Sequence, residues 1–167
     1  MSLRARADGA AFWSSLVIGL LLTVFALPEV LRALKPFWLA LLVVYWALEA
    51  PERMRLGTAF MLGLAGDLLS GSLLGEQALR LLVLAFIVAR LRARMRFFPM
   101  PQQTLLVLGL LLNDRVVMLM VRVFQGTPAP DWTFWLAPAT GALLWPWLFL
   151  LLDLARARGG RAPRGEA

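Results

Sequence analysis

The chain contains no cysteine and no histidine among its 167 residues. Disulfides, zinc sites built from cysteine and histidine, and serine–histidine catalytic triads are therefore excluded. Ser14, Ser15, Ser70 and Ser72 have no histidine to activate them, and no glycine–lysine loop is present to cradle a phosphate. We expect neither a metal nor another cofactor, and a binder, carrier or scaffold rather than an enzyme.

Charge is also scarce, because only 16% of the residues are charged while 60% are hydrophobic. A soluble domain carries about a quarter charged residues, so this chain has too little polar surface to cover itself in water. The charges are clustered, and long apolar runs separate them. This composition indicates a polytopic membrane protein with a single domain.

Six apolar runs are candidate membrane spans, since a helix needs about 20 mostly apolar residues to cross a bilayer. The pattern predicts an all-α bundle of six transmembrane helices within residues 1–158, with a disordered cytoplasmic tail at 159–167. Almost nothing remains for a domain outside the membrane. The six runs are Ala10–Leu27, Pro36–Leu48, Leu56–Leu74, Gln77–Val88, Thr104–Val121 and Trp132–Leu152.

The basic residues predict the orientation of these spans. Twelve arginines fall on the side that holds both termini, the second loop and the fourth loop. The other side holds Arg32, Lys35, Arg80 and Arg122. This asymmetry predicts both termini in the cytoplasm. The net charge of +7 could also indicate nucleic-acid binding, but the arginines stand where membrane topology and anionic lipids need them, so no nucleic acid is expected.

Asp67, Asp114 and Arg115 lie deep inside predicted spans, where ionisable groups are costly and mark candidate sites. Asp67 and Asp114 are each about ten residues into a span, and Arg115 lies at the same depth. We expect Arg115 to pair with Asp67 across the bundle near the midplane, with Asn113 and Asp114 nearby. Such a pair either fixes the helix register or belongs to a proton or substrate path.

Small residues and prolines form further patterns in the spans. Ala59, Gly63, Asp67, Gly71 and Gly75 recur every four residues, which favours close helix packing inside the bundle. A shorter ridge on the first span could instead receive a partner's helix. Two prolines within the sixth span, together with Gly141, are expected to kink it. The ridge consists of Ala11, Ser15 and Gly19, and the prolines are Pro138 and Pro146.

A longer stretch, beginning KPFWLALLVVYWALEAPERM at Lys35, resembles the rod shape-determining protein MreD family of bacterial cytoplasmic membranes. The resemblance covers about Pro28–Gln103. The matching elements are Pro36, Tyr45–Trp46, Pro51, Gly63, Asp67, Gly71, Gly75, Ala78, Phe97 or Phe98, and Gln102–Gln103. The fifth and sixth spans match only in character, so no role is carried onto Asn113, Asp114 or Arg115.

The resemblance implies a non-enzymatic component of the machinery that builds the lateral peptidoglycan wall. Such proteins work with the bitopic protein MreC, and through it with MreB and a wall glycosyltransferase–transpeptidase pair. The family is also similar in fold to the six-helix substrate-binding subunits of energy-coupling-factor transporters. That similarity makes a cavity in the bundle plausible without assigning a substrate.

The candidate surfaces for MreC are the ridge on the first span and the segment from Tyr45 to Pro51. Tyr45 and Trp46 could equally be interfacial anchors. The competing hypothesis is a transporter subunit that binds a small solute near Asp67 and Arg115. A lipid-modifying enzyme is disfavoured by the missing nucleophile and base, and the sequence leaves open whether the chain forms a homodimer.

Overall fold

A computed structural model describes residues 3–25, 34–128 and 130–159 of the chain. Within these residues the regular secondary structure is entirely helical, which confirms the predicted all-α class, and each of the six apolar runs overlaps one α-helix. The predicted tail lies outside the described residues except for Gly159, as does the end of the first predicted span. The helices are α1 (Leu3–Val24), α3 (Trp38–Glu49), α4 (Leu56–Ser70), α5 (Glu76–Met95), α6 (Met100–Phe124), the short 3-10 helix η1 (Trp132–Trp135) and α7 (Leu136–Gly159).

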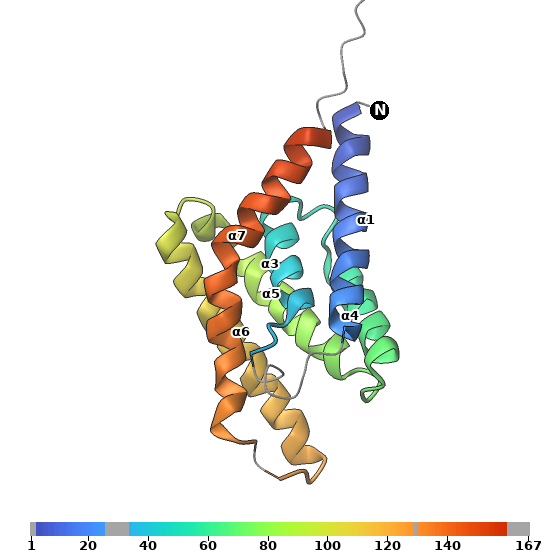
Figure 1. Cartoon of the computed structure of the whole chain (residues 1–167), viewed down its shortest axis with the longest axis vertical. Coiled ribbons are helices and arrows are strands. Elements are labelled where there is room, and N and C mark those ends of the chain that lie inside the picture. The colour runs from blue at the N-terminus through green and yellow to red at the C-terminus, as the bar shows by residue number, and fades with distance from the viewer. Residues whose placement is uncertain (1–2, 26–33, 129, 160–167) are drawn as a thin grey trace, which may run out of the picture.

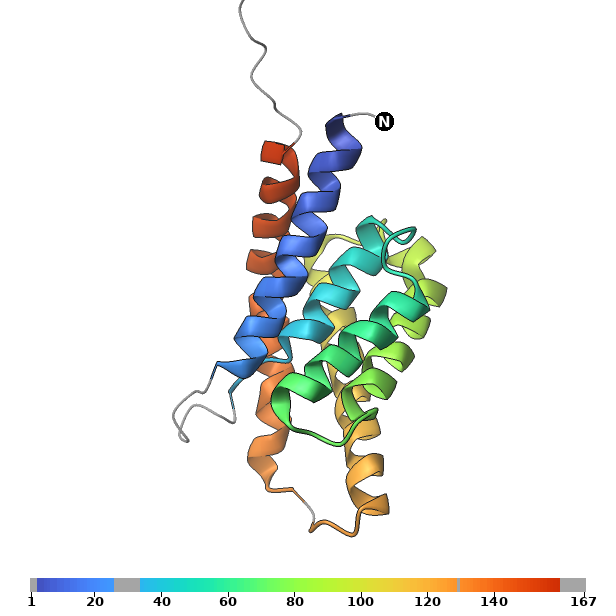
Figure 2. The same ribbon diagram turned by 90° about the vertical axis from the view of Figure 1, so that its right-hand side faces the viewer.

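Helix α3 forms the centre of the bundle, with α1 and α7 on one side and α4 and α5 on the other (Figures 1 and 2). Every residue from Leu39 to Leu48 is buried. No charge interrupts this stretch, and a helix that is apolar all round is expected in a core rather than at a surface. With 12 residues α3 is about 18 Å long, which is shorter than the hydrocarbon core of a bilayer.

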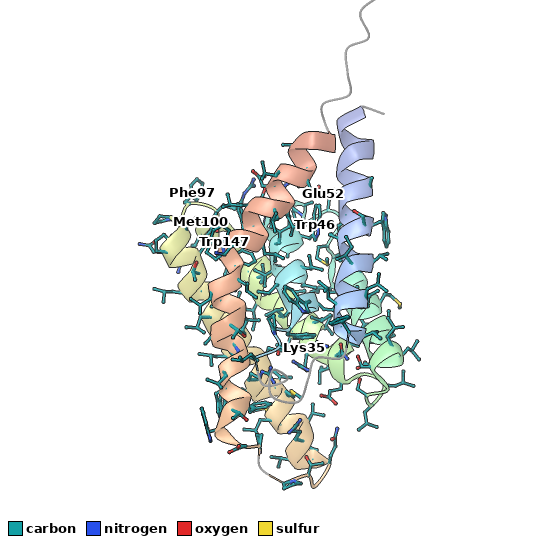
Figure 3. The ribbon with its side chains drawn as sticks, in the orientation of Figure 1. Lys35, Trp46, Glu52, Phe97, Met100 and Trp147 are labelled. Atoms are coloured by element: carbon teal, nitrogen blue, oxygen red, sulfur yellow. The ribbon has the colours of Figure 1, made fainter. Side chains whose placement is uncertain are left out.

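The outer surface of the bundle is apolar, in contrast to that of a soluble protein. Large hydrophobic side chains point outward from every helix that surrounds α3, and Trp147 of α7 is one of them (Figure 3). A contiguous apolar exterior of this kind indicates contact with membrane or protein rather than water. Examples are Trp13, Leu21, Met61, Leu68, Phe86, Leu105, Met120, Leu143 and Trp147.

In the part of the chain that the structure describes, two helical segments are long and apolar enough to cross a membrane. They are Met100–Phe124, with 25 residues and a mean hydropathy of 1.9, and Trp132–Ala157, with 26 residues and a mean hydropathy of 1.5. In the most apolar 18-residue stretch of each segment, only 22% and 28% of the residues, respectively, are buried inside the bundle. A core helix of a soluble protein would be mostly buried, so this exposure favours contact with lipid. The lower ends of α6 and α7 project beyond the other helices (Figures 1 and 2).

Helices α4 and α5 pack against each other at very short range, and Gly63 makes this possible. A Cβ atom on Gly63 would lie 2.3 Å from the Cα atom of Ala78 and 2.6 Å from its backbone nitrogen. The prediction that Gly63 serves packing inside the bundle is therefore confirmed. The prediction is wrong for Gly71 and Gly75, because α4 ends at Ser70 and both glycines lie in the connection to α5. Their φ angles of +64° and +101° are left-handed, a conformation that glycine adopts without steric cost.

Gly63→Ala is expected to destabilise the protein by about 1–3 kcal/mol, because the added methyl group forces backbone away from backbone. Gly57→Ala is the matched control, since a Cβ atom there meets nothing within 4 Å. That change is expected to be neutral or slightly stabilising, because alanine has the higher helix propensity. Thermal unfolding of the detergent-solubilised protein measures both variants. Equal midpoints for the two would contradict the close approach of α4 and α5.

The two prolines of the sixth predicted span have different positions. Pro138 lies in the first turn of α7, where backbone N–H groups have no partner within the helix in any case. Pro138 therefore does not stand in the interior of α7, where the expected kink would need it to be. Pro146 does lie inside α7.

Candidate functional site: buried charges and a basic cavity

Asp67 stabilises the beginning of α5 from its position on α4. Its carboxylate accepts hydrogen bonds from the Ser72 hydroxyl at 2.8 Å and from the backbone N–H groups of Gly75 and Gln77 at 2.8 and 2.9 Å. A longer bond of 3.4 Å comes from the N–H group of Ala78. These donors belong to the connection and to the first turn of α5, where an anion also interacts favourably with the helix dipole. Asp67 is 1% exposed, and its carboxylate is satisfied without a cation.

Asp114 forms a buried ion pair with Arg80 of α5. The guanidinium donates to the carboxylate with two nitrogens, and the distance from Nε to Oδ1 is 2.8 Å. Arg80 also lies 4.0 Å from Glu76 and stacks over the ring of Phe37 at 4.3 Å from its centroid. Arg80 and Asp114 are 6% and 2% exposed. This bidentate arrangement ties α5 to α6 in a defined register.

The predicted pair between Asp67 and Arg115 is therefore wrong. The donors at Asp67 come from the α4–α5 connection, and the cation at Asp114 is Arg80. The charge distribution counts Arg80, near the start of the predicted span Gln77–Val88, with the outer side, but the structure buries Arg80 one turn inside α5, which begins at Glu76. The sequence does contain a signal for this pair, because Arg80 stands at the beginning of an apolar run and is therefore a candidate partner for an aspartate inside the membrane. If Arg80 is not counted among the loop residues, the predicted difference in basic residues between the two sides of the membrane becomes larger.

Arg115 follows Asp114 directly but points in another direction, because successive residues of a helix are about 100° apart. Its guanidinium lies 3.7 Å from the sulfur of Met118 and 4.6 Å from the centroid of the Phe134 ring. The guanidinium of Arg122, two turns further along α6, lies 5.5 Å from the same ring centroid. Among the described residues, no carboxylate forms an ion pair with Arg115.

Arg115, Arg80 and Lys35 line one cavity of about 240 Å³ near the end of α1. Lys35, labelled near the lower end of α1 in Figure 3, donates to the carbonyl oxygens of Thr23 and Phe25 at 2.6 and 2.9 Å. Phe37, Trp38 and Met118 contribute apolar walls. Among the described residues, the lining contains three cationic side chains, and the charge of Arg80 is balanced by Asp114.

Most of the residues predicted to contact a partner lie inside the bundle instead. Tyr45 and Trp46 are 0% exposed, so neither serves as a partner surface or as an anchor at the membrane interface. Trp46 donates from its indole nitrogen to the hydroxyl of Ser15 at 2.8 Å. A Cβ atom on Gly19 would lie 2.3 Å from a methyl carbon of Leu42. The small-residue ridge of α1 thus receives the chain's own α3, and the prediction of a partner helix there is wrong.

Ala11 and Pro51 are the remaining members of that set, and both are half-buried. Ala11 packs against the central cluster at the edge of α1, and Pro51 lies in the connection between α3 and α4. Gln103, which carries part of the family resemblance, has a structural role, because its amide donates to the carbonyl of Met95 at the end of α5. At the same end of the bundle, Arg156 pairs with Glu49 at 3.1 Å.

Among the described residues, a helical bundle with many exposed apolar side chains and two helices long enough to cross a bilayer favours the class of integral membrane proteins. The chain belongs to the family of the rod shape-determining protein MreD, whose model matches residues 9–155. The resemblance found in the sequence is thus confirmed.

A curated relative supports the same assignment. The chain is 34% identical over 145 residues to the rod shape-determining protein MreD of Haemophilus influenzae, a match that covers 87% of this chain and 90% of that protein. No solved structure matches the chain. The similarity to energy-coupling-factor subunits stays a prediction.

Proposed function

We propose that this chain is a non-enzymatic, multi-pass component of the bacterial cytoplasmic membrane that binds MreC and supports lateral wall synthesis in the elongation complex. The observation that carries the proposal is the family match over residues 9–155. In this proposal the six α-helices form a six-span transmembrane bundle. Both termini are cytoplasmic, because most of the arginines lie on their side of the membrane. MreB and the wall-polymerising enzymes are reached through MreC. The chain then acts by holding other proteins in place.

The outward face of α6 is the best candidate surface for the transmembrane helix of MreC. Gly109 is exposed, and a Cβ atom on it would meet nothing within 4 Å. Asn113, one turn further along, is also exposed, near the middle of this 25-residue helix. No other described residue forms a hydrogen bond with its side chain. An amide facing hydrocarbon is unfavourable, whereas a helix packed at a glycine can supply it with a partner.

The test is co-purification of MreC with variants of this face. Asn113→Leu and Gly109→Leu are each expected to lower the yield of bound MreC by about fivefold to thirtyfold, as the loss of 1–2 kcal/mol of helix association implies. Gly57→Leu is the matched control, because Gly57 is an equally open glycine on α4. MreC recovered at the wild-type level with both α6 variants would contradict this surface. No MreC with the wild-type protein would contradict the proposed function itself.

A further inference from the structure

The end of α5 carries a dense run of positive charge. Four arginines fall within seven residues, and the chain has no acidic residue from Gln77 to Asn113. The helix ends at Met95, so this run lies beyond the apolar stretch of α5 and at the opposite end from the buried Arg80. In a membrane such a position corresponds to the lipid headgroups, which arginine side chains reach from a helix end. The four residues are Arg90, Arg92, Arg94 and Arg96.

Two of these arginines line a surface pocket of about 590 Å³, here named the α5 pocket. Its lining residues recur every three or four positions, so they share one face of the helix. The two alanines among them have short side chains, which leave the space between the arginines open. Arg90 and Arg94 point away from the pocket, because each is one residue and about 100° removed from a lining position. The lining consists of Ala89, Arg92, Ala93, Arg96 and Phe97.

The arginines of the α5 pocket have no anionic partner in the part of the chain that the structure describes. Neither Arg92 nor Arg96 forms an ion pair there. Arg92 is held in place by α3, because its Nε donates to the carbonyl oxygen of Leu48 at 3.3 Å. This single bond leaves the two terminal nitrogens of its guanidinium for a ligand. Arg96 is exposed, and its side chain forms no hydrogen bond with a described residue.

The acidic residues after α3 do not neutralise the pocket. Glu49, which follows Leu48, pairs with Arg156 at 3.1 Å. Glu52 is labelled beside α1 in Figure 3, whereas Phe97 is labelled at the tip of the bundle away from α1. The α5 pocket therefore presents two fixed cations to an anion from outside the chain.

Phe97 gives the pocket an apolar edge. Its side chain is 88% exposed, which is unfavourable in water for a large aromatic ring. At the boundary between headgroups and acyl chains, an exposed aromatic ring is favourable. A cationic hollow with such a ring at its edge matches a phospholipid, whose charged headgroup adjoins an apolar tail.

We propose that the α5 pocket binds the headgroup of an anionic phospholipid. The phosphate lies between Arg92 and Arg96, Ala93 leaves room for it, and the ring of Phe97 contacts the beginning of the acyl chains. A free anion would use the arginines but leaves the exposed ring unexplained. The site is separate from the α6 face proposed for MreC, because Gly109 lies nine residues after α6 begins, so either proposal can fail alone.

The test is lipid binding to the purified full chain, measured by native mass spectrometry with dioleoyl phosphatidylglycerol and dioleoyl phosphatidylcholine. The wild-type protein is expected to bind phosphatidylglycerol about twentyfold more tightly, since two basic residues contribute about fivefold each. The double variant Arg92→Gln with Arg96→Gln is expected to bind both lipids about equally. Arg90→Gln with Arg94→Gln is the matched control, because it removes the same charge from the same helix outside the pocket, and it should retain the preference.

Further variants separate the shape of the pocket from its charge. Ala93→Leu fills the pocket without changing the charge and is expected to weaken phosphatidylglycerol binding, whereas Ala139→Leu, at an exposed alanine of α7, is not. Arg96→Gln alone leaves the bond between Arg92 and Leu48 intact, so it keeps the test valid if the double variant fails to fold, and it should reduce the preference about fivefold.

Three results would overturn the proposal. Equal binding of the two lipids by the wild-type protein would show that the pocket does not select an anionic lipid and would favour an acidic protein partner. Equal losses in the two double arginine variants would indicate unspecific attraction to the charged run. Displacement of phosphatidylglycerol by added inorganic phosphate would indicate a site for a free anion.

Discussion

Replacing Arg80 with methionine is expected to destabilise the bundle by about 3–5 kcal/mol, the usual cost of removing one partner of a buried ion pair. The change leaves the carboxylate of Asp114, which is 2% exposed, without the two donors that now satisfy it. Arg80 also stacks on Phe37, and methionine recovers part of that contact. Unfolding in a detergent titration, followed by circular dichroism, measures the effect.

The double variant Arg80→Met with Asp114→Leu separates the pair from its packing. Because both charges are then absent, the double variant is expected to recover most of the stability that the single variant loses. Arg80→Lys keeps the charge but cannot donate with two nitrogens in the same plane, and is expected to fall between wild type and Arg80→Met. If Arg80→Met unfolds at the wild-type detergent concentration, the buried pair does not stabilise the fold.

Asp67→Ala is expected to have the second largest effect, a loss of about 3 kcal/mol, because three buried or part-buried donors lose their acceptor at once. The affected groups are the hydroxyl of Ser72 and the backbone N–H groups of Gly75 and Gln77. Asp67→Asn retains one carbonyl oxygen but also brings an NH₂ group, and is expected to lose less. Asp153→Asn is the control, because Asp153 is exposed on α7 and its replacement should change stability by no more than about 0.5 kcal/mol.

Hydrogen exchange locates the effect of Asp67. The amides of Gly75, Gln77 and Ala78 are expected to exchange faster in Asp67→Ala than in wild type, since the first turn of α5 loses its acceptor. Amides in the middle of α6 should respond only to the global change in stability. Unchanged exchange at the start of α5 would show that Asp67 is not the group that stabilises this helix end.

The sequence was sufficient to locate the helices and the polar residues among them, but not to pair those residues. The hydropathy pattern indicates how deep in the membrane Asp67, Asp114 and Arg115 lie, and this depth makes them candidate site residues. Pairing depends also on the direction in which each side chain leaves its helix. That direction depends on the packing of α4, α5 and α6, which a single sequence does not contain.

The lack of information on helix packing also explains why the burial of Tyr45 and Trp46 was not predicted. An aromatic pair near the end of an apolar run fits a membrane interface, a partner surface or a core, and the pattern is the same in all three cases. Only the position of α3 at the centre of the bundle selects the core. The central position of α3 also gives Ser15 its role, because the Ser15 hydroxyl accepts the hydrogen bond that the buried indole nitrogen of Trp46 needs to donate. The four-residue spacing of small residues was interpreted correctly at Gly63, but the end of α4 at Ser70 could not be read from it.

The most direct test of the central claim, that this chain supports rod shape by holding a partner at α6, is gene replacement in a rod-shaped bacterium depleted of its own family member. Cell width and length are measured by microscopy at matched membrane levels of each variant. Round cells are expected on depletion, rods with the wild-type chain or Gly57→Leu, and round cells with Asn113→Leu. Rods that persist without the chain, or that Asn113→Leu restores as fully as wild type, would contradict the claim.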